Sequence, residues 1–172
     1  FVYGRIKPVI NRLLLFIGKK FILKGSINKD YKGFSEKKKR FFKNNSLVRR
    51  FYINSFMIEN IIQVFFKVTI PNKIFRYNII LDRYYYDTIF TDLGYDLSMN
   101  DDEVIKLLNR YRKFFPNPNY IFFINTPVSV CFKRKDDIPD IKYLKDRLYY
   151  YMLLFETEDV ISLDGKKLKE RI

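Results

Sequence analysis

An aspartate and an arginine, Asp82 and Arg83, directly follow the short apolar run Ile79-Ile80-Leu81. Such a run is typical of a buried parallel strand, and open α/β sheets bind their ligands at the C-terminal ends of these strands. A carboxylate there can hold a metal ion or accept a proton, and a guanidinium can bind a phosphate through its planar fork of donors. We therefore predict a phosphate site at this pair; the alternative is a surface ion pair that contributes little.

Further basic side chains follow in later segments. Arg134 lies between Lys133 and Lys135 near the end of a predicted helix, and Arg147 lies on the next predicted helix. Phosphoryl transfer depends on cations from several segments that position and neutralise a polyphosphate. The alternative for Arg147 is a helix-surface residue that pairs with acidic neighbours.

The composition limits the class of protein. The chain has 172 residues, with 48% hydrophobic and 30% charged residues, which favours one globular domain with a substantial core. The formal charge of +14 predicts an anionic partner, although a lysine-coated surface encoded by AT-rich codons explains it equally simply. A single cysteine, Cys131, and no histidine exclude an intramolecular disulfide, a cysteine-based zinc site and a histidine-dependent triad.

Short apolar strands alternate with amphipathic helical patterns along the chain. Strands are predicted at 1–3, 79–81, 120–124 and 160–163, and helices at about 8–17, 36–68 (broken near 44–46), 85–93, 101–115, 126–133, 140–155 and after 165. This order predicts an α/β fold of three layers, a parallel sheet flanked by helices, in one domain over residues 1–172. The apolar stripe of the long second helix is expected at Phe51, Ile58, Ile61, Ile62, Phe65 and Phe66.

The ordered motifs resemble the thymidylate kinase family of nucleoside-monophosphate kinases, which have a P-loop α/β fold. The resemblance rests on the apolar strand with Asp-Arg-Tyr at 79–84 and on the Pro-Asn-Pro-Asn turn at 116–119 with its following strand. It continues in 130–137, which is similar to the entry into the family's lid, and in 160–165, which is similar to its last strand. The match extends over 78–172 and is weaker over 1–72.

The resemblance implies roles around the transferred phosphoryl group. Arg83 would bind the phosphate of the acceptor, and Asp82 would act near Mg²⁺ through water or orient Arg83. Arg134 and Arg147 would be lid cations over the phosphoryl group, and Arg134 with Lys135 would contact ATP.

The resemblance also implies contacts with the acceptor nucleotide. Arg5 would lie near the acceptor phosphate, unless it is simply a turn residue, and Phe56 would be the aromatic that holds the base. Tyr84 would also contact the acceptor, although aromatics at such spacing more often belong to a core. The arginine that accompanies this aromatic in the family has no counterpart near Met57, so thymine specificity is not implied.

One departure concerns the phosphate loop. No G-x-x-x-x-G-K-[ST] segment occurs in the sequence, and Phe1 lies in an apparent strand. We expect that the family's first strand, loop and helix are missing and that these 172 residues alone do not transfer phosphate.

The expected function is therefore Mg²⁺- and ATP-dependent phosphoryl transfer onto dTMP or a related nucleotide, with in-line displacement and a homodimer as the family's usual assembly. Two alternatives stay open: a basic module that binds nucleotide or nucleic acid, and a degenerate kinase fold used for protein interaction. Because acids interleave with the basic residues, nucleic acid is the less expected partner. With no signal peptide and no apolar run of about 18 residues, we expect a cytoplasmic location and no membrane partner.

Overall fold

The strands form two parallel pairs. The computed structural model describes residues 2–4, 6, 31–134, 138 and 140–166. Strand β1 (Val2–Gly4) pairs with β2 (Ile79–Leu81), and β3 (Ile121–Asn125) pairs with β4 (Val160–Asp164). Within these residues the pairs are separate sheets of two strands each, so the prediction of one continuous three-layer sheet stays a prediction.

The helices make up most of the rest of the described chain. They are α2 (Tyr31–Asn44), α3 (Ser46–Val64), the π-helix η1 (Phe65–Thr69), α4 (Ile70–Lys73), α5 (Tyr85–Asp87), the π-helix η2 (Thr88–Tyr95), α6 (Asp101–Tyr111), the 3₁₀-helix η3 (Arg112–Phe114), α7 (Val128–Arg134) and α8 (Ile141–Thr157). The strands predicted at 79–81, 120–124 and 160–163 are confirmed to within one residue. The helix predicted at 36–68 breaks at Asn45, but it continues through η1 and α4 to Lys73.

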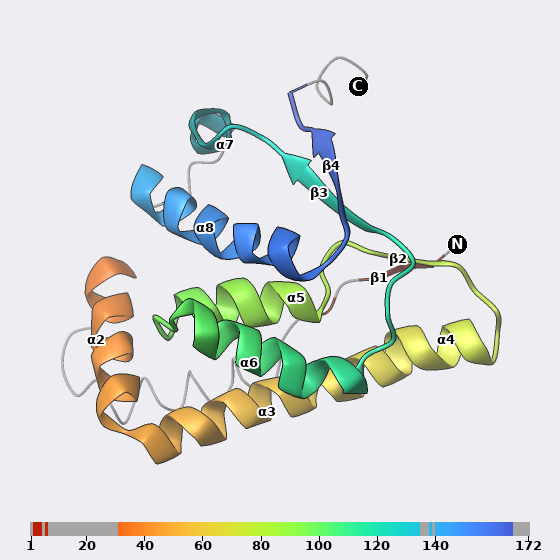
Figure 1. The fold of residues 1–172 in the computed structure, drawn as a ribbon, viewed down its shortest axis with the longest axis horizontal. Helices are drawn as coiled ribbons and strands as arrows, with labels where there is room; N and C mark the ends of the chain where they lie inside the picture. The colour runs from red at the N-terminus through yellow and green to blue at the C-terminus, as the bar shows by residue number, and fades with distance from the viewer. Residues whose placement is uncertain (1, 5, 7–30, 135–137, 139, 167–172) are drawn as a thin grey trace.

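Successive helical layers surround a central segment made of α5 and η2 (Figure 1). Helix α8 packs on one side of η2, and α6 packs between η2 and α3. The most deeply buried side chains come from these elements, with Tyr85, Ile89, Phe90, Leu93 and Leu108 all at most 1% exposed. The segment that follows Asp82 and Arg83, α5 with η2, therefore forms part of the core itself.

The face of α3 that enters this core differs from the predicted stripe. Tyr52, Phe56, Met57 and Val64 are buried, whereas the predicted stripe residues Phe51, Ile58, Ile62, Phe65 and Phe66 are exposed. Both sets recur at helical spacing, because this helix is apolar on two opposite sides. The predicted stripe was therefore wrong for all of its residues except Ile61, which packs at the edge of the core.

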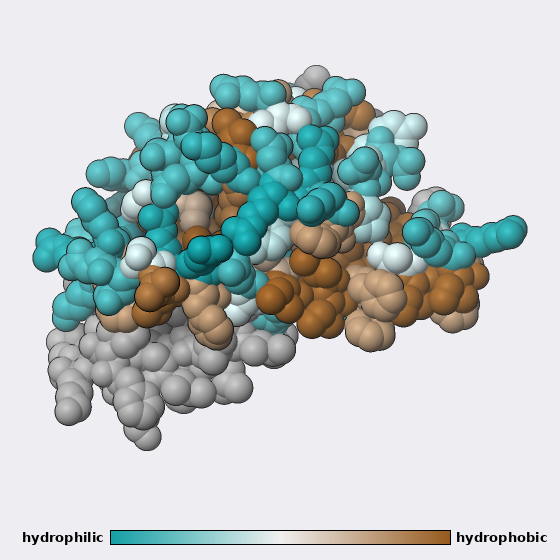
Figure 2. All heavy atoms as spheres, turned by 60° about the horizontal axis from the view of Figure 1, so that its bottom comes forward, coloured by the Kyte–Doolittle hydropathy of each residue, from teal (hydrophilic) through white to brown (hydrophobic). Residues whose placement is uncertain are grey.

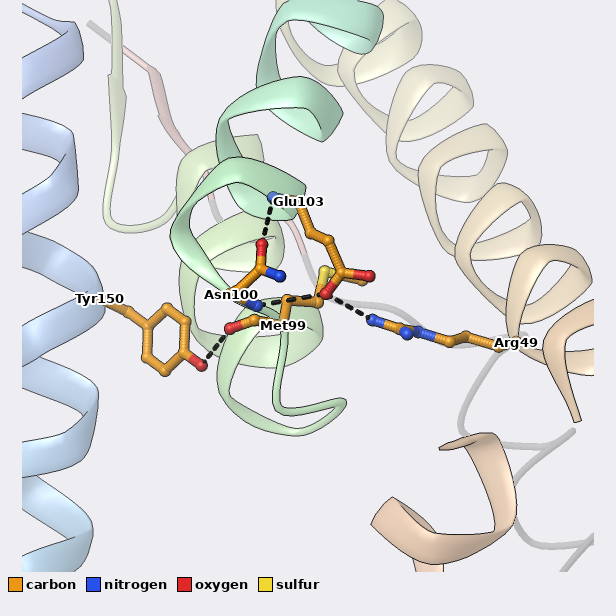
Figure 3. A network of polar contacts seen from close by, with 5 residues as sticks. All are labelled: Arg49, Met99, Asn100, Glu103 and Tyr150. Atoms are coloured by element: carbon orange, nitrogen blue, oxygen red, sulfur yellow. Dashed lines mark hydrogen bonds and ion pairs between the residues drawn. The ribbon is translucent and has the colours of Figure 1, made fainter. Parts of the chain in front are cut away.

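A capping box fixes the turn between η2 and α6. Asn100 accepts a hydrogen bond from the backbone N–H of Glu103 (2.9 Å), and the Glu103 carboxylate accepts one from the Asn100 N–H (3.2 Å). The same carboxylate pairs with Arg49 of α3 at 3.1 Å, and the Tyr150 hydroxyl of α8 donates to the Met99 carbonyl at 2.7 Å (Figure 3). One turn thus ties α3 and α8 to the C-terminal end of η2.

The strands are apolar on both faces, but only one face is covered. Phe123 of β3 points toward α8, where it contacts the rings of Tyr151 and Phe155. Its neighbours Phe122 and Ile124 are 58% and 56% exposed, and Tyr3 and Ile80 of the other pair are exposed as well. Strands of this kind are usually covered on both faces.

Candidate phosphate-binding site

Asp82 and Arg83 lie at the C-terminal end of the first strand pair. The backbone N–H of Asp82 donates to the carbonyl of Gly4 at 3.1 Å, which extends the β1–β2 ladder by one hydrogen bond. The prediction that this pair directly follows a parallel strand is therefore confirmed. The Asp82 side chain is exposed, and Arg83 is half-buried.

Three acids of the next segment gather near Arg83. Asp87 ends α5, Asp92 lies within the π-helix η2, and Asp96 directly follows it. The pKa of Asp92 is raised to about 6, chiefly by burial and also by the charges of Asp96 and Asp87, while Arg147 and Arg83 oppose the shift. Both arginines therefore lie close enough to Asp92 to act on its charge.

Arg147 reaches this place from α8. Its guanidinium lies over the ring of Tyr143 at 4.8 Å and over the ring of Tyr95 at 5.6 Å. A guanidinium is held well between aromatic faces because the ring quadrupole attracts the cation. Arg147 is thus not the exposed helix-surface residue of the alternative interpretation.

One donor of Arg147 is buried without a partner. Its Nε makes no hydrogen bond within the described part of the chain. Buried N–H groups are nearly always hydrogen-bonded in folded proteins, so an unpaired donor of an arginine is an exception that calls for an acceptor. No family model, curated protein or solved structure matches the chain. The chemistry of this place therefore has to be argued from its own residues.

The two outer acids already have partners. The Tyr151 hydroxyl of α8 donates to Asp87, and Lys38 of α2 pairs with Asp96 at 2.8 Å. The Lys38 side chain is only 10% exposed, so this ion pair is largely shielded from solvent. Asp92 lies between Asp87 and Asp96 in the sequence and interacts electrostatically with both acids and with both arginines. We call these side chains the acidic-basic cluster: Lys38, Arg83, Asp87, Asp92, Asp96 and Arg147. Within the cluster, Arg83, Asp92 and Arg147 form what we call the central triad.

The central triad can change its charge near neutral pH. Above a pH of about 6, the Asp92 carboxylate offsets one of the two guanidinium charges. When Asp92 is protonated, the arginines keep both charges and the site favours an anion more strongly. Two convergent guanidiniums suit a phosphate better than two lysines would, because their donors are planar and fixed.

The other predicted site residues lie elsewhere or outside the described part. Phe56 is 4% exposed and packs against Tyr52 with ring centroids 5.2 Å apart, so its ring is in the core. Tyr84 packs against Tyr85 and Phe115, and its hydroxyl donates to the carbonyl of Pro116 at 2.8 Å.

Of the two predicted lid cations, Arg147 belongs to the cluster and Arg134 does not. Arg134 is exposed at the end of α7, and the structure records no contact of Arg134 with the central triad among the residues it describes. Arg5 and Lys135 lie outside the described residues. Arg83 and Arg147 thus both act on the charge of Asp92, whereas Phe56 and Tyr84 pack against other aromatic rings and Arg134 lies at the exposed end of α7.

The sequence analysis missed three residues of the cluster, because no motif marks them: Lys38, Asp92 and Asp96. The available signal was three acids, at 87, 92 and 96, in an otherwise apolar segment. Asp87 and Asp92 are five residues apart along α5 and η2, and a π-helix, which bonds residue i to residue i+5, sets residues at this spacing closer to one face than an α-helix does.

A bound metal ion would depend on its substrate for most of its ligands. Within the described ranges, no group of three or more His, Cys, Asp or Glu side chains is placed to hold a metal. The exposed Asp82 carboxylate is still suitable for Mg²⁺, which commonly takes one or two carboxylates, several waters and substrate phosphates.

Proposed function

We propose that this chain is a nucleoside-monophosphate-kinase-like domain that binds a nucleotide phosphate with Arg83 and Arg147. The observation that carries the proposal is that Arg83, at the C-terminal end of a parallel strand pair, and Arg147, from α8, both act on the charge of Asp92, and that the buried Nε of Arg147 has no partner within the described residues. Ligands of open α/β sheets bind at such strand ends. The proposed acceptor is dTMP or a related nucleotide, and the proposed donor is ATP with Mg²⁺.

In this proposal, each side chain of the cluster has a distinct task. Arg83 binds the acceptor phosphate, and Arg147 supplies a second cation, with its free Nε–H available to a phosphoryl oxygen. The rings of Tyr143 and Tyr95 hold the guanidinium of Arg147 in place. Asp82 would hold Mg²⁺, which, when bound, would supply neutralisation of phosphate charge. Phosphoryl transfer is catalysed largely by such positioning and charge stabilisation.

The arrangement of the strand pairs is compatible with this fold family. Tyr84 follows β2 and bonds to Pro116, which precedes β3, so the two pairs are held near each other. Each pair has unpaired strand edges within the described residues. A further parallel strand that carries a phosphate loop would find hydrogen-bonding partners at those edges.

A nucleotide-binding module without catalysis is the second candidate. It is favoured by the absence of a G-x-x-x-x-G-K-[ST] segment from the sequence, because such loops hold the phosphates of the donor. Both candidates predict binding of a nucleoside monophosphate, but only the first predicts phosphoryl transfer once a phosphate loop is supplied.

Calorimetric titration with dTMP tests the proposed acceptor site. We expect Arg83→Ala to weaken binding by roughly tenfold or more, because a charge-assisted, bidentate contact with the phosphate is lost. Arg147→Ala should weaken binding as well. Arg110→Ala is the matched control, since Arg110 is an exposed arginine of α6, and it should bind dTMP as the wild type does.

Two results would speak against the proposal. The acceptor site is refuted if the wild-type chain does not bind dTMP or any other nucleoside monophosphate. It is also refuted if Arg83→Ala and Arg110→Ala bind equally well. A parallel assay of phosphoryl transfer from ATP to dTMP should be negative for these 172 residues, and measurable turnover would overturn that expectation.

A further inference from the structure

An exposed apolar surface runs along the C-terminal half of the long helix. It is formed by exposed side chains of α3, η1 and the segment after α4, which we call the outer ridge: Ile58, Ile62, Phe65, Phe66, Ile74, Phe75 and Tyr77. Phe66 is 62% exposed and Ile74 is 67% exposed. Figure 2 shows hydrophobic residues gathered along this part of the molecule, with hydrophilic side chains beyond its far end. Contiguous apolar surface of this kind usually marks an interaction site.

The opposite side of the same helix is already occupied by the core. Met57 is fully buried, and the buried Asn60 accepts a hydrogen bond from Thr88 at 3.1 Å. The helix therefore cannot turn its ridge inward without taking Met57 and Asn60 out of the core. A helix that is apolar on both sides needs a second partner for its outer face.

The charges beside the ridge indicate the chemistry of that partner. Between residues 43 and 77 the only acid is Glu59, which is buried, and the basic residues are Lys43, Arg49, Arg50, Lys67, Lys73 and Arg76. Lys67, Lys73 and Arg76 are exposed next to the ridge. A second copy packed antiparallel would bring basic ends together, which is unfavourable. A partner with an apolar interior and an anionic surface would match both the apolar side chains of the ridge and the basic residues beside it.

The ridge is suited to lie on a membrane rather than to cross one. The stretch Ser46–Lys73 is long and apolar enough to span a bilayer by length and composition, the one such helix in the described part of the chain. Crossing would place Glu59 and Asn60 in hydrocarbon, where polar side chains are costly. The rings of Phe75 and Tyr77, stacked at 5.8 Å, lie at the end of the ridge, and aromatic side chains of this kind favour the membrane–water interface.

We infer that the outer ridge docks on the surface of a membrane that contains anionic lipids. The long helix lies parallel to the surface, Phe65, Phe66 and Phe75 enter the boundary between headgroups and acyl chains, and the exposed basic residues contact the headgroups. Amphipathic helices with basic residues beside an apolar face bind membranes in this way.

Vesicle co-sedimentation of the full chain tests this inference. We expect the wild type to sediment with vesicles that contain about 30% phosphatidylserine and much less with pure phosphatidylcholine, because anionic lipid attracts the basic residues. The double variant Phe65→Ser/Phe66→Ser should lower the partition coefficient by roughly tenfold or more, since the buried apolar area is lost. Lys67→Glu/Lys73→Glu should remove the preference for anionic lipid.

The control variant is Phe122→Ser/Ile124→Ser, which removes two exposed apolar side chains of similar exposure from β3. It should bind the vesicles as the wild type does. Far-UV circular dichroism of each variant checks that the fold is kept, as expected for exposed positions.

Four results would overturn the inference. The first is a wild type that does not sediment with anionic vesicles. The second is equal binding by the Phe65→Ser/Phe66→Ser variant and the wild type. The third is wild-type protein that stays with the vesicles after alkaline carbonate extraction, which would indicate a spanning helix. The fourth is a dimer of the wild type in analytical ultracentrifugation that Phe65→Ser/Phe66→Ser abolishes, which would assign the ridge to a second copy of the chain.

Discussion

The side chain of Asp92 has an unusual setting for a carboxylate. It is half-buried in η2 among two other acids and two arginines, and burial is the largest cause of its raised pKa of about 6. The ionised form of Asp92 is therefore less stable in the folded protein than in the unfolded chain, where an aspartate has a pKa of about 3.9. The ionised Asp92 therefore lowers the free energy of unfolding. This loss is fully present above a pH of about 6 and disappears as the pH falls toward 4.

Replacement of Asp92 by asparagine should stabilise the protein at neutral pH. We expect Asp92→Asn to raise the free energy of unfolding by about 2 kcal/mol at pH 7, because the cost of the buried charge is removed. The difference from the wild type should shrink toward zero near pH 4. Urea unfolding at several pH values between about 4 and 8 measures it.

Asp159→Asn serves as the control, because Asp159 is exposed in the turn before β4. Its free energy of unfolding should follow that of the wild type over the same pH range. A stability difference for Asp92→Asn that does not change with pH would contradict the assignment of the titrating group.

The sequence drew attention to the two arginines of the central triad but not to its aspartate. The position of Arg83 after a parallel strand is confirmed, and Arg147, which the resemblance singled out, acts on the charge of Asp92; their roles toward a phosphate stay predictions. Asp92 could not be predicted, since its proximity to both arginines depends on the packing of α8 against η2. Phe56 was predicted to hold a base, whereas its ring packs on Tyr52 in the core.

Among the elements, α3 shows most clearly that apolar spacing alone does not identify the core face. Met57 and Ile58 are neighbours in the sequence, yet Met57 is 0% exposed and Ile58 is 55% exposed. Both belong to apolar sets with helical spacing, so the sequence predicts a helix but leaves its orientation open. The orientation follows from polar contacts of the inner face, such as Asn60 with Thr88 and Asn54 with Tyr111.

This pair of neighbours gives a direct test of the orientation. Met57→Ala should lower the free energy of unfolding by about 3 kcal/mol, because it leaves a cavity in the core. Ile58→Ala should change it by about 0.5 kcal/mol or less, since its side chain is exposed. Chemical denaturation of both variants measures the difference, and equal losses would mean that the ridge is covered within the protein itself.

One helix start could be predicted from a local cap, whereas the ends of the long helix could not. The helix predicted from Asp140 begins as expected, with the Asp140 side chain accepting a hydrogen bond from the Tyr143 N–H at 2.7 Å. Such caps are local features of the sequence and need no tertiary contact.

At the scale of the whole molecule, the two strand pairs expose apolar side chains that strands of a parallel sheet usually bury. Phe122, Ile124, Ile161 and Leu163 project from the uncovered face of β3 and β4. Exposed apolar strands with unpaired edges are sites of self-association. The sequence predicted each strand, but the pairing of all strands in one sheet depends on contacts that no local pattern contains.

A charge on the uncovered face should therefore improve solubility. Phe122→Lys should reduce concentration-dependent aggregation, measured by light scattering, without lowering the unfolding midpoint. Phe123→Lys, at the next position, should destabilise the protein by about 2 kcal/mol or more, because that side chain packs against Tyr151 and Phe155. Reversed results for the two variants would contradict the assignment of the faces.

The π-helix η2 makes the number of residues between Asp87 and Asp96 as important as their identity. Its wide turn sets residues five positions apart, such as Asp87 and Asp92, closer to one face than an α-helix would. A substitution within 88–91 changes one side chain, whereas a deletion there shifts the register of every residue that follows on the segment. In an alignment of homologues that keep this cluster, η2 would accept no gap.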